Sequence, residues 1–122
     1  MKTFPRGIVL FGHGSRDPLW HRPMQAVEQR ISAQDPSVLV RCAYLELTQP
    51  DLAVASASLV AAGVLHITVV PMFLGVGRHA REDLPALLQA LRAQHPAIEF
   101  SLQCAVGEDS RLIDQLAHIA LS

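Results

Sequence analysis

Short apolar runs alternate with helix-like stretches along the whole of this chain of 122 residues. The apolar runs are GIVLFG, VLVRCAYLEL, LHITVVPMFL and IEFSLQCAV. Continuous apolar runs of this length are typical of strands that are buried on both faces of a parallel sheet. Because a helical stretch follows each run, we predict an α/β domain in which right-handed crossovers place helices on both faces of one sheet.

The helical stretches are marked by apolar spacing and by residues that favour helix ends. Met24, Val27 and Ile31 recur every three or four residues and predict a first helix that ends before AQDPS. The second helix, PDLAVASASLVAAG, has Pro50 in its first turn and Gly63 as its C-terminal cap. The segment PLWHRP predicts that the first helix starts late or with a kink.

Two more helices are predicted in the second half of the chain. HAREDLPALLQALRAQHP forms the third, and Pro85 marks where its regular hydrogen bonding begins. GEDSRLIDQLAHIALS forms the last, capped by Asp109 or Ser110. No linker or low-complexity tract interrupts the alternation, so residues 1–122 are expected to form a single domain. Four strands are few, and the sheet could be completed or covered by another subunit.

Composition limits the classes of partner. The formal net charge of −1 excludes the electrostatic footprint of a protein that binds nucleic acid or an anionic membrane. Cys42 and Cys104 lie in strand-like contexts without the CxxC spacing of zinc or redox sites, and we interpret both as reduced core residues. The apolar run from Gly7 to Phe11 is too short for a signal peptide or a membrane span, so we expect a cytoplasmic protein.

The strand order determines where a ligand would bind. In an open parallel sheet, ligands bind beyond the carboxyl ends of the strands, at the point where the strand order reverses. With the flavodoxin-like order 2-1-3-4 in a three-layer αβα domain, that crevice lies between the first and third strands. His13, in LFGHGSRDP, follows the first strand, and His79 follows the third across the turn GVG. We therefore expect these two imidazoles to face each other.

His13 stands between Gly12 and Gly14, which let the backbone turn sharply and leave the imidazole open to a ligand. A different interpretation remains open, in which GHGS is only a strand-to-helix turn whose amides bind a phosphate. The histidines outside the crevice are interpreted as structural or surface residues, as is common for this residue type. They are His21, His66, His95 and His118.

Two carboxylates are placed near the crevice. Glu46 lies at the carboxyl end of the second strand. An acid within an apolar run is costly unless it reaches solvent or a partner, so we expect Glu46 to point into the crevice. Asp83 lies four residues after His79, where a helix brings a carboxylate back toward the ring. Asp83 either fixes the tautomer of His79 from a position behind the metal site or simply stabilises the first helical turn.

Two neutral imidazoles and a carboxylate at an open site suit a divalent first-row metal ion such as cobalt, nickel, iron or zinc. Two nitrogens cannot fill a coordination sphere, so the metal would be held loosely, unlike a structural zinc ion that four ligands enclose. Arginines around the crevice are compatible with an acidic organic substrate, although they could also be plain surface charge. They are Arg16, Arg22, Arg78 and Arg81.

The blocks GHGSRDP, AYLELTQPDL, VVPMFLGVGRHAREDLP and GEDSRL resemble, in order and over nearly the whole chain, those of the short single-domain CbiX-type sirohydrochlorin chelatases. The combination is specific, whereas GHGS alone is a weak signal. The resemblance implies a class II chelatase, a lyase that inserts a divalent metal into the polycarboxylated tetrapyrrole sirohydrochlorin without ATP. It implies no cofactor beyond the substrate metal. It favours cobalt, and hence cobalamin biosynthesis, with nickel and ferrous iron as the alternatives.

The resemblance also implies roles for individual residues. His13 and His79 would bind the metal and face the macrocycle as catalytic residues, and Glu46 would assist proton removal. Longer relatives fuse two such units, so a one-unit chain is expected to pair as a homodimer in which each copy supplies one half of a class II chelatase. Sirohydrochlorin and a divalent metal ion are the expected partners, with no nucleic acid and no membrane.

The chemistry of insertion agrees with such a site. Two pyrrole N–H protons must leave before the metal enters the ring, so the site needs a loosely held metal and a nearby base. The apolar loop after the third strand offers a surface for a flat macrocycle. We expect substrate contacts from this loop and from polar residues beside the two histidines. These residues are Met72, Phe73, Leu74, Ser15, Arg16 and Arg78.

Two other functions fit parts of the pattern. A non-catalytic protein of the same fold that carries a metal or a tetrapyrrole would keep His13 and His79 but would need no proton acceptor at Glu46. An enzyme of the histidine phosphatase type also has glycine and histidine after its first strand. That family places an arginine directly before the histidine, where this chain has Gly12, and the chain is short for that fold.

Overall fold

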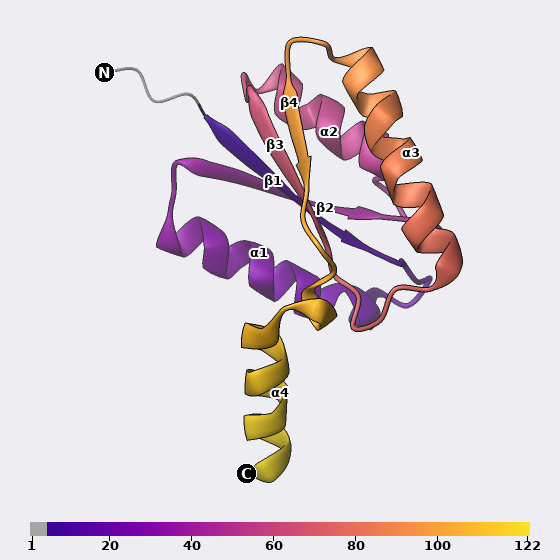
Figure 1. The fold of residues 1–122 in the computed structure, drawn as a ribbon. Helices are drawn as coiled ribbons and strands as arrows, with labels where there is room; N and C mark the ends of the chain where they lie inside the picture. Colours follow the sequence, from indigo (N-terminus) through magenta and orange to yellow (C-terminus); the bar gives the residue numbers. More distant parts are fainter. Residues whose placement is uncertain (1–4) are drawn as a thin grey trace.

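The computed structural model describes residues 5–122, apart from the side chain of His79. Its strands form one parallel sheet in the order β2-β1-β3-β4, which confirms the predicted order and the predicted fold class. Figure 1 shows this sheet with helices on either side. The strands are β1 (Arg6–Gly12), β2 (Val38–Tyr44), β3 (His66–Pro71) and β4 (Glu99–Leu102).

The helices form two layers around the sheet. On one face, α1 (Arg22–Gln34) packs against β2 and β1. On the other face lie α2 (Leu52–Ala61) and α3 (Arg78–Gln94), which pack against β2 and β1 and against β4, respectively. The last helix, α4 (Ser110–Leu121), extends away from these layers (Figure 1). In residues 5–122, every helix is too short or too polar to cross a membrane.

The two faces of the sheet bury unequal cores. The side chains of Val9, Phe11 and Val69 point toward α2 and α3 and join the main core with leucines of both helices. The opposite face, under α1, has a smaller fully buried cluster of Leu10, Val38 and Val40. The α1 face is therefore the less completely covered of the two.

The strand register brings the carboxyl ends of the first three strands to one edge. Gly12 at the end of β1 pairs with Tyr44 at the end of β2. Backbone hydrogen bonds continue beyond the strands, because the Leu45 N–H donates to the Gly12 carbonyl at 2.9 Å and the Met72 N–H donates to the Phe11 carbonyl at 2.7 Å. The segments that follow β1, β2 and β3 therefore start side by side.

Several predicted element boundaries are wrong, among them the end of β2 and the role of Pro85 in α3. β2 ends at Tyr44, before Glu46, and Leu47 then adopts a φ of 67°, which an extended strand does not allow. α3 starts at Arg78, one residue before the predicted start, and Pro85 lies inside the helix instead of marking where its regular hydrogen bonding begins. Pro85 is on the exposed side of α3. A proline has no N–H to donate to the carbonyl one turn earlier in the helix, and on this side water can bind that carbonyl instead.

Other helix ends agree more closely with the sequence signals. A 3-10 turn, η1 (Pro18–His21), precedes α1, and Pro23 lies in the first turn of α1, which confirms the irregular start. Asp109 caps α4 as predicted. The prediction that Pro50 lies in the first turn of α2 is wrong, because α2 starts at Leu52 and Asp51 is its capping residue, which accepts a hydrogen bond from the Val54 N–H.

The two cysteines differ in burial, so the prediction that both are core residues is wrong for Cys104. β4 ends at Leu102, and Cys104 is an exposed free thiol in the segment that follows. Cys42 is half-buried in β2, and its thiol donates a hydrogen bond to Glu28 Oε2 at 3.1 Å. Burial, together with the nearby Glu28 carboxylate, raises the pKa of Cys42 to about 12.

We expect a thiol reagent at pH 8 to modify Cys104 rapidly and Cys42 more than about tenfold more slowly, because only the thiolate reacts and Cys42 stays protonated. Ellman's reagent on the native protein measures both rates. Cys104→Ser should abolish the fast phase, and Cys42→Ser should leave it intact. Equal rates for the two thiols would contradict the burial of Cys42.

Candidate functional site

His13 lies at the carboxyl edge of the sheet, directly after β1, and its side chain is exposed. Its ring lies 4.4 Å from the ring of Phe73, centroid to centroid, at a tilt of 45°. Phe73 is only 3% exposed and packs edge-on against Phe11 at 6.1 Å. The core thus supports one side of the imidazole and leaves the other side open to solvent.

Gly14 lets the loop after β1 fold tightly against the segment after β2. Its φ of 94° is disfavoured for residues with a side chain, and a Cβ there would lie 1.9 Å from the Glu46 carbonyl oxygen. The Glu46 N–H also donates to the His13 carbonyl at 3.1 Å. The backbones of His13 and Glu46 are therefore adjacent, and the Glu46 side chain is exposed beside them.

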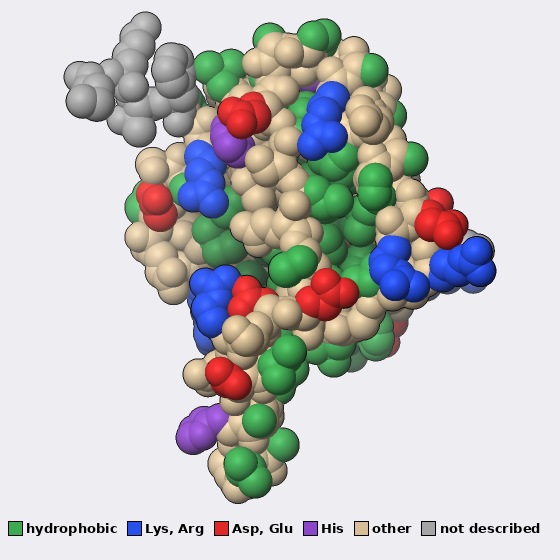
Figure 2. All heavy atoms as spheres, in the orientation of Figure 1, with side chains coloured by type: hydrophobic (Ala, Val, Ile, Leu, Met, Phe, Trp, Pro, Cys, Tyr) green, Lys and Arg blue, Asp and Glu red, His purple; other side chains and the backbone are tan. Residues whose placement is uncertain are grey.

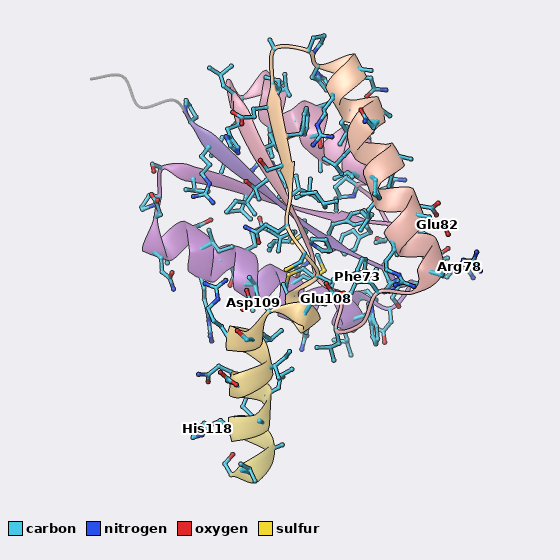
Figure 3. The ribbon with its side chains drawn as sticks, viewed as in Figure 1. Phe73, Arg78, Glu82, Glu108, Asp109 and His118 are labelled. Carbon is cyan, nitrogen blue, oxygen red and sulfur yellow. The ribbon has the colours of Figure 1, made fainter. Side chains whose placement is uncertain are left out.

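α3 begins at the carboxyl edge and carries His79 in its first turn. The His79 side chain lies outside the described part of the structure, and so does the predicted opposition of the two imidazoles. Asp83 follows one turn later and is exposed. Arg78, the first residue of α3, forms an ion pair with Glu82 at 3.3 Å in which both side chains are largely exposed (Figure 3).

The loop after β3 is held in place by η2 (Val106–Glu108). The Gly107 N–H donates to the Phe73 carbonyl at 3.0 Å, and a Cβ on Gly107 would lie 1.7 Å from the Leu74 oxygen. Leu74 is 69% exposed and Met72 is partly exposed. The structure differs from the sequence-based expectation at Phe73, because this ring fills the core beneath His13 and leaves Leu74 and Met72 as the apolar surface.

Local hydrogen bonds shape the turn after the GHGS segment. The Ser15 hydroxyl accepts a bond from the Asp17 N–H at 3.1 Å, and the Asp17 carboxylate accepts one from the Leu19 N–H at 3.0 Å. Arg16 lies between these residues and is exposed. The turn therefore fixes its own backbone and directs Arg16 to solvent at the edge that carries His13.

His21 supports this loop in a way that sequence reasoning missed. Its ring is buried, lies 4.5 Å from the ring of Tyr44, and binds the Ser15 carbonyl through Nε2 at 2.9 Å. A carbonyl only accepts hydrogen bonds, so Nε2 carries the proton and donates it. Burial raises the pKa of Tyr44 to about 12, which keeps its phenol uncharged. The only sequence signal for this contact is the irregular PLWHRP segment.

Two shallow recesses lie between the segment after β2 and the helices α2 and α3, and they share Leu45 and Leu87. One, of about 300 Å³, is also lined by Asp83 and Ala86. The other, of about 210 Å³, extends to Phe11 and Tyr44 at the strand ends. Within the described side chains, which exclude that of His79, no group of three or more His, Cys, Asp or Glu residues could hold a metal ion.

Sequence comparison places the chain among chelatase-related proteins. A family model described as CbiX matches residues 7–120. A sirohydrochlorin cobaltochelatase of Methanosarcina acetivorans is 34% identical over 82 residues, which are 67% of this chain and 63% of that protein. A sirohydrochlorin ferrochelatase of Bacillus subtilis is 26% identical over 113 residues, which are 93% of this chain and 43% of that protein. The chain thus spans less than two thirds of the length of these curated relatives.

The solved structures that resemble this fold also include CbiX and SirB proteins. A putative cobalamin biosynthesis CbiX protein from Marinobacter aquaeolei superimposes with a TM-score of 0.81 at 31% identity and covers 95% of this chain and 94% of its own. The sirohydrochlorin chelatase SirB from Bacillus subtilis subspecies spizizenii, in complex with cobalt, superimposes with a TM-score of 0.79 at 26% identity. That match covers 94% of this chain and 49% of SirB.

Gly14→Ala should lower the free energy of unfolding by more than about 2 kcal/mol, because the new Cβ meets the Glu46 carbonyl and the φ of 94° strains an alanine. Gly75→Ala is the matched control, since its Cβ would enter open space, and it should change stability by less than about 0.5 kcal/mol. Urea unfolding followed by circular dichroism measures both. Equal stability of the two variants would contradict the close packing of the His13 loop against Glu46.

Proposed function

The chain belongs to the CbiX family, and from this membership we propose that it is a chelatase that inserts a divalent metal ion into sirohydrochlorin without ATP. The observation that carries the proposal is the family match over residues 7–120. One relative is named a cobaltochelatase and another a ferrochelatase, and both names give sirohydrochlorin as the macrocycle. The macrocycle is thus the common feature, and the metal differs between relatives.

Cobalt is the metal that we propose for this chain, with ferrous iron and nickel as alternatives. The archaeal relatives from Methanosarcina and Methanococcoides are both named cobaltochelatases. Affinities among first-row divalent ions follow an intrinsic order, so the metal that a loose site takes depends strongly on metal supply. Cobalt insertion would place the reaction in cobalamin biosynthesis.

We propose His13 and His79 as the ligands that present the metal to the macrocycle. His13 is exposed and its ring contacts the buried ring of Phe73, and His79 is in the first turn of the helix that starts at the same edge of the sheet. Two protein ligands leave several coordination positions for water. A metal held in this way can exchange its waters for pyrrole nitrogens and leave the protein with the product.

Glu46 is proposed as the base that accepts a pyrrole proton. Its backbone N–H is bonded to the His13 carbonyl, and its exposed side chain allows a proton on the carboxylate to pass on to water. Asp83 lines the adjacent recess one turn after His79. We propose that Asp83 accepts a hydrogen bond from the His79 ring and thereby orients it.

The substrate contacts that we propose combine charge and apolar surface. Arg16 and Arg78 would bind carboxylates of the tetrapyrrole, with Ser15 beside them, and Leu74 and Met72 would contact its flat face. Arg78 is paired with Glu82, but an exposed ion pair contributes only about 0–1 kcal/mol. Arg78 can therefore leave Glu82 for a substrate carboxylate at little cost.

We also propose that the active form pairs two copies of this single-domain chain. The chain matches about half the length of SirB, with 49% of that protein covered. The surface of one such domain is open at its carboxyl edge, where His13 and Leu74 are exposed. A second copy would enclose the macrocycle from the other side and exclude water from the insertion step.

The absorption spectrum of sirohydrochlorin, mixed with the protein and with cobalt, nickel or ferrous ions in turn, tests the proposed activity. We expect insertion to be faster than the uncatalysed reaction with at least one metal. No acceleration with any of the three would exclude the chelatase. A wild-type protein that binds metal and sirohydrochlorin without inserting would instead be a carrier of the same fold.

Within the same assay, Glu46→Gln should lower the insertion rate by about 10²-fold, because it removes the proton acceptor. Cobalt affinity, measured by calorimetry, should stay within about twofold, since Glu46 is not a proposed ligand. Glu99→Gln is the control, because Glu99 starts β4 at the opposite edge of the sheet. An insertion rate that is equal in the two variants would remove Glu46 from the mechanism.

A further inference from the structure

α4 stands apart from the layers of the domain. It has no buried residue, and its substantial contacts are with η2. Figures 1 and 2 show it projecting from the body of the protein near the carboxyl edge. Large apolar side chains along it are exposed to solvent, including Ile113 at 50% and Ile119 at 65%.

The side chains of α4 divide into an apolar face and a polar face. Helical spacing places Leu112, Ile113, Leu116 and Ile119 on one side. Arg111, Asp114 and His118 lie on the other side, and Figure 3 shows His118 pointing outward from the helix. An isolated helix of 12 residues is marginally stable in water, so its apolar face requires a covering surface.

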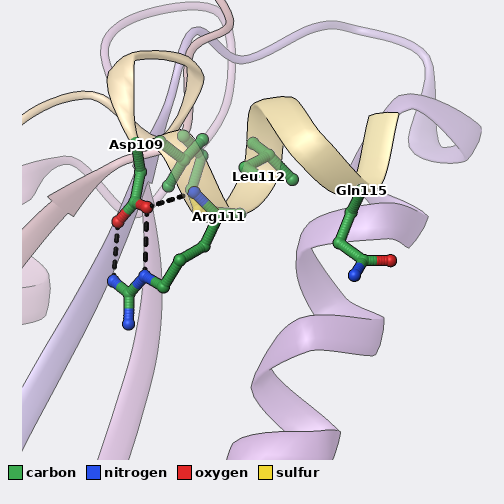
Figure 4. Close-up of a pocket in the computed structure, with 6 residues that line it drawn as sticks. Asp109, Arg111, Leu112 and Gln115 are labelled. Carbon is green, nitrogen blue, oxygen red and sulfur yellow. Dashed lines mark hydrogen bonds and ion pairs between the residues drawn. The ribbon is translucent and has the colours of Figure 1, made fainter. Parts of the chain in front are cut away.

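On the α1 face of the sheet, a helix covers only one half of the strands. α1 covers β2 and β1, whereas Val70 of β3 and the adjacent Met72 are only partly buried on this side. A hollow of about 430 Å³ lies at the carboxyl end of this face, between Met72, Val106 and Leu112 (Figure 4). Parallel sheets are normally covered on both faces. The apolar face of α4 is thus uncovered, and so is the α1 face of the sheet at β3.

The connection into α4 directs the helix away from its own sheet. Gly107 is held against the loop after β3 by its hydrogen bond to the Phe73 carbonyl. Asp109 caps α4, and Arg111 donates two side-chain hydrogen bonds to the Asp109 carboxylate, at 3.0 and 2.6 Å (Figure 4). These bonds lower the pKa of Asp109 to about 2, so its carboxylate is ionised at neutral pH. These bonds order the first turn of α4, and the helix leaves the domain in the outward direction that Figure 1 shows.

We propose that two copies of this chain exchange α4, so that the apolar face of each helix packs on the α1 face of β3 and β4 in the other copy. The arrangement is two-fold symmetric, so each copy contributes one helix and one receiving surface, and the same contact forms twice. Because the contact forms twice, its buried area is doubled, toward the roughly 800 Å² per partner of a specific interface. Because α4 leaves from the carboxyl edge, the exchange draws the edge that carries His13 toward the other copy.

A second copy fits α4 better than a membrane surface does. Helices that lie on membranes are rich in Lys and Arg on their polar face, whereas residues 110–122 contain one arginine and no lysine. The matches to solved Bacillus proteins cover only 49% and 46% of those chains, so a longer single chain has room for a second unit of this size. The inference rests on the pairing of two copies proposed above and is independent of the metal chemistry.

Light scattering after size exclusion, without metal or tetrapyrrole, tests the exchange. The wild-type protein should have twice the chain mass of 13.3 kDa at micromolar concentration. Leu116→Glu, which places a charge in the apolar face, should reduce the mass to that of one chain while circular dichroism still shows a folded domain. His118→Glu is the matched control, two residues away on the polar face, and should remain a dimer.

A monomeric wild-type protein, or a dimer that Leu116→Glu leaves intact, would overturn the proposal. A lower melting temperature for Leu116→Glu without a change in mass would mean that α4 folds back on its own sheet, which also overturns it. If Leu116→Glu does not fold, Ile119→Glu near the end of the helix is read in its place. Because the measurement needs no activity, the exchange and the chelatase can each fail while the other stands.

Discussion

The parallel register of β1, β2 and β3, continued by hydrogen bonds beyond the strand ends, is the constraint on which the rest of the structure depends. The bonds from Leu45 to Gly12, from Glu46 to His13 and from Met72 to Phe11 hold three loops together at one edge. Since these are backbone bonds, they place residues that are far apart in the sequence without using any side chain. The side chains at that edge remain available for chemistry.

The topology could be predicted because it follows from the alternation of apolar runs and helical stretches, which leaves few ways to build a sheet. The residues at which individual strands end were harder to predict. A strand continues only while its neighbours pair with it, so the apolar run through Glu46 could not show that β2 ends at Tyr44. In the same way, Cys104 lies in a strand-like sequence but beyond the last residue of β4 that pairs with β3.

At the candidate site, too, one part could be predicted from the sequence and another could not. Glycine on both sides of His13 indicated an exposed imidazole at a tight turn, and the structure has that turn, with Gly14 at positive φ. The supporting contacts come from tertiary packing. The position of Phe73 beneath the imidazole has no sequence signature, and the bond from His21 to Ser15 has only the irregular PLWHRP segment. The outward direction of α4 was equally hidden, because an amphipathic pattern shows that a helix needs cover and not which surface supplies it.

We propose that the carboxyl edge of this sheet presents one metal ion through His13 and His79. X-ray absorption at the cobalt edge of the cobalt-loaded protein counts imidazole ligands directly, before any tetrapyrrole is added. We expect two imidazoles in the wild-type protein and one in each of His13→Ala and His79→Ala. A cobalt ion without imidazole ligands in the wild type, or a ligand count that neither substitution changes, would contradict it.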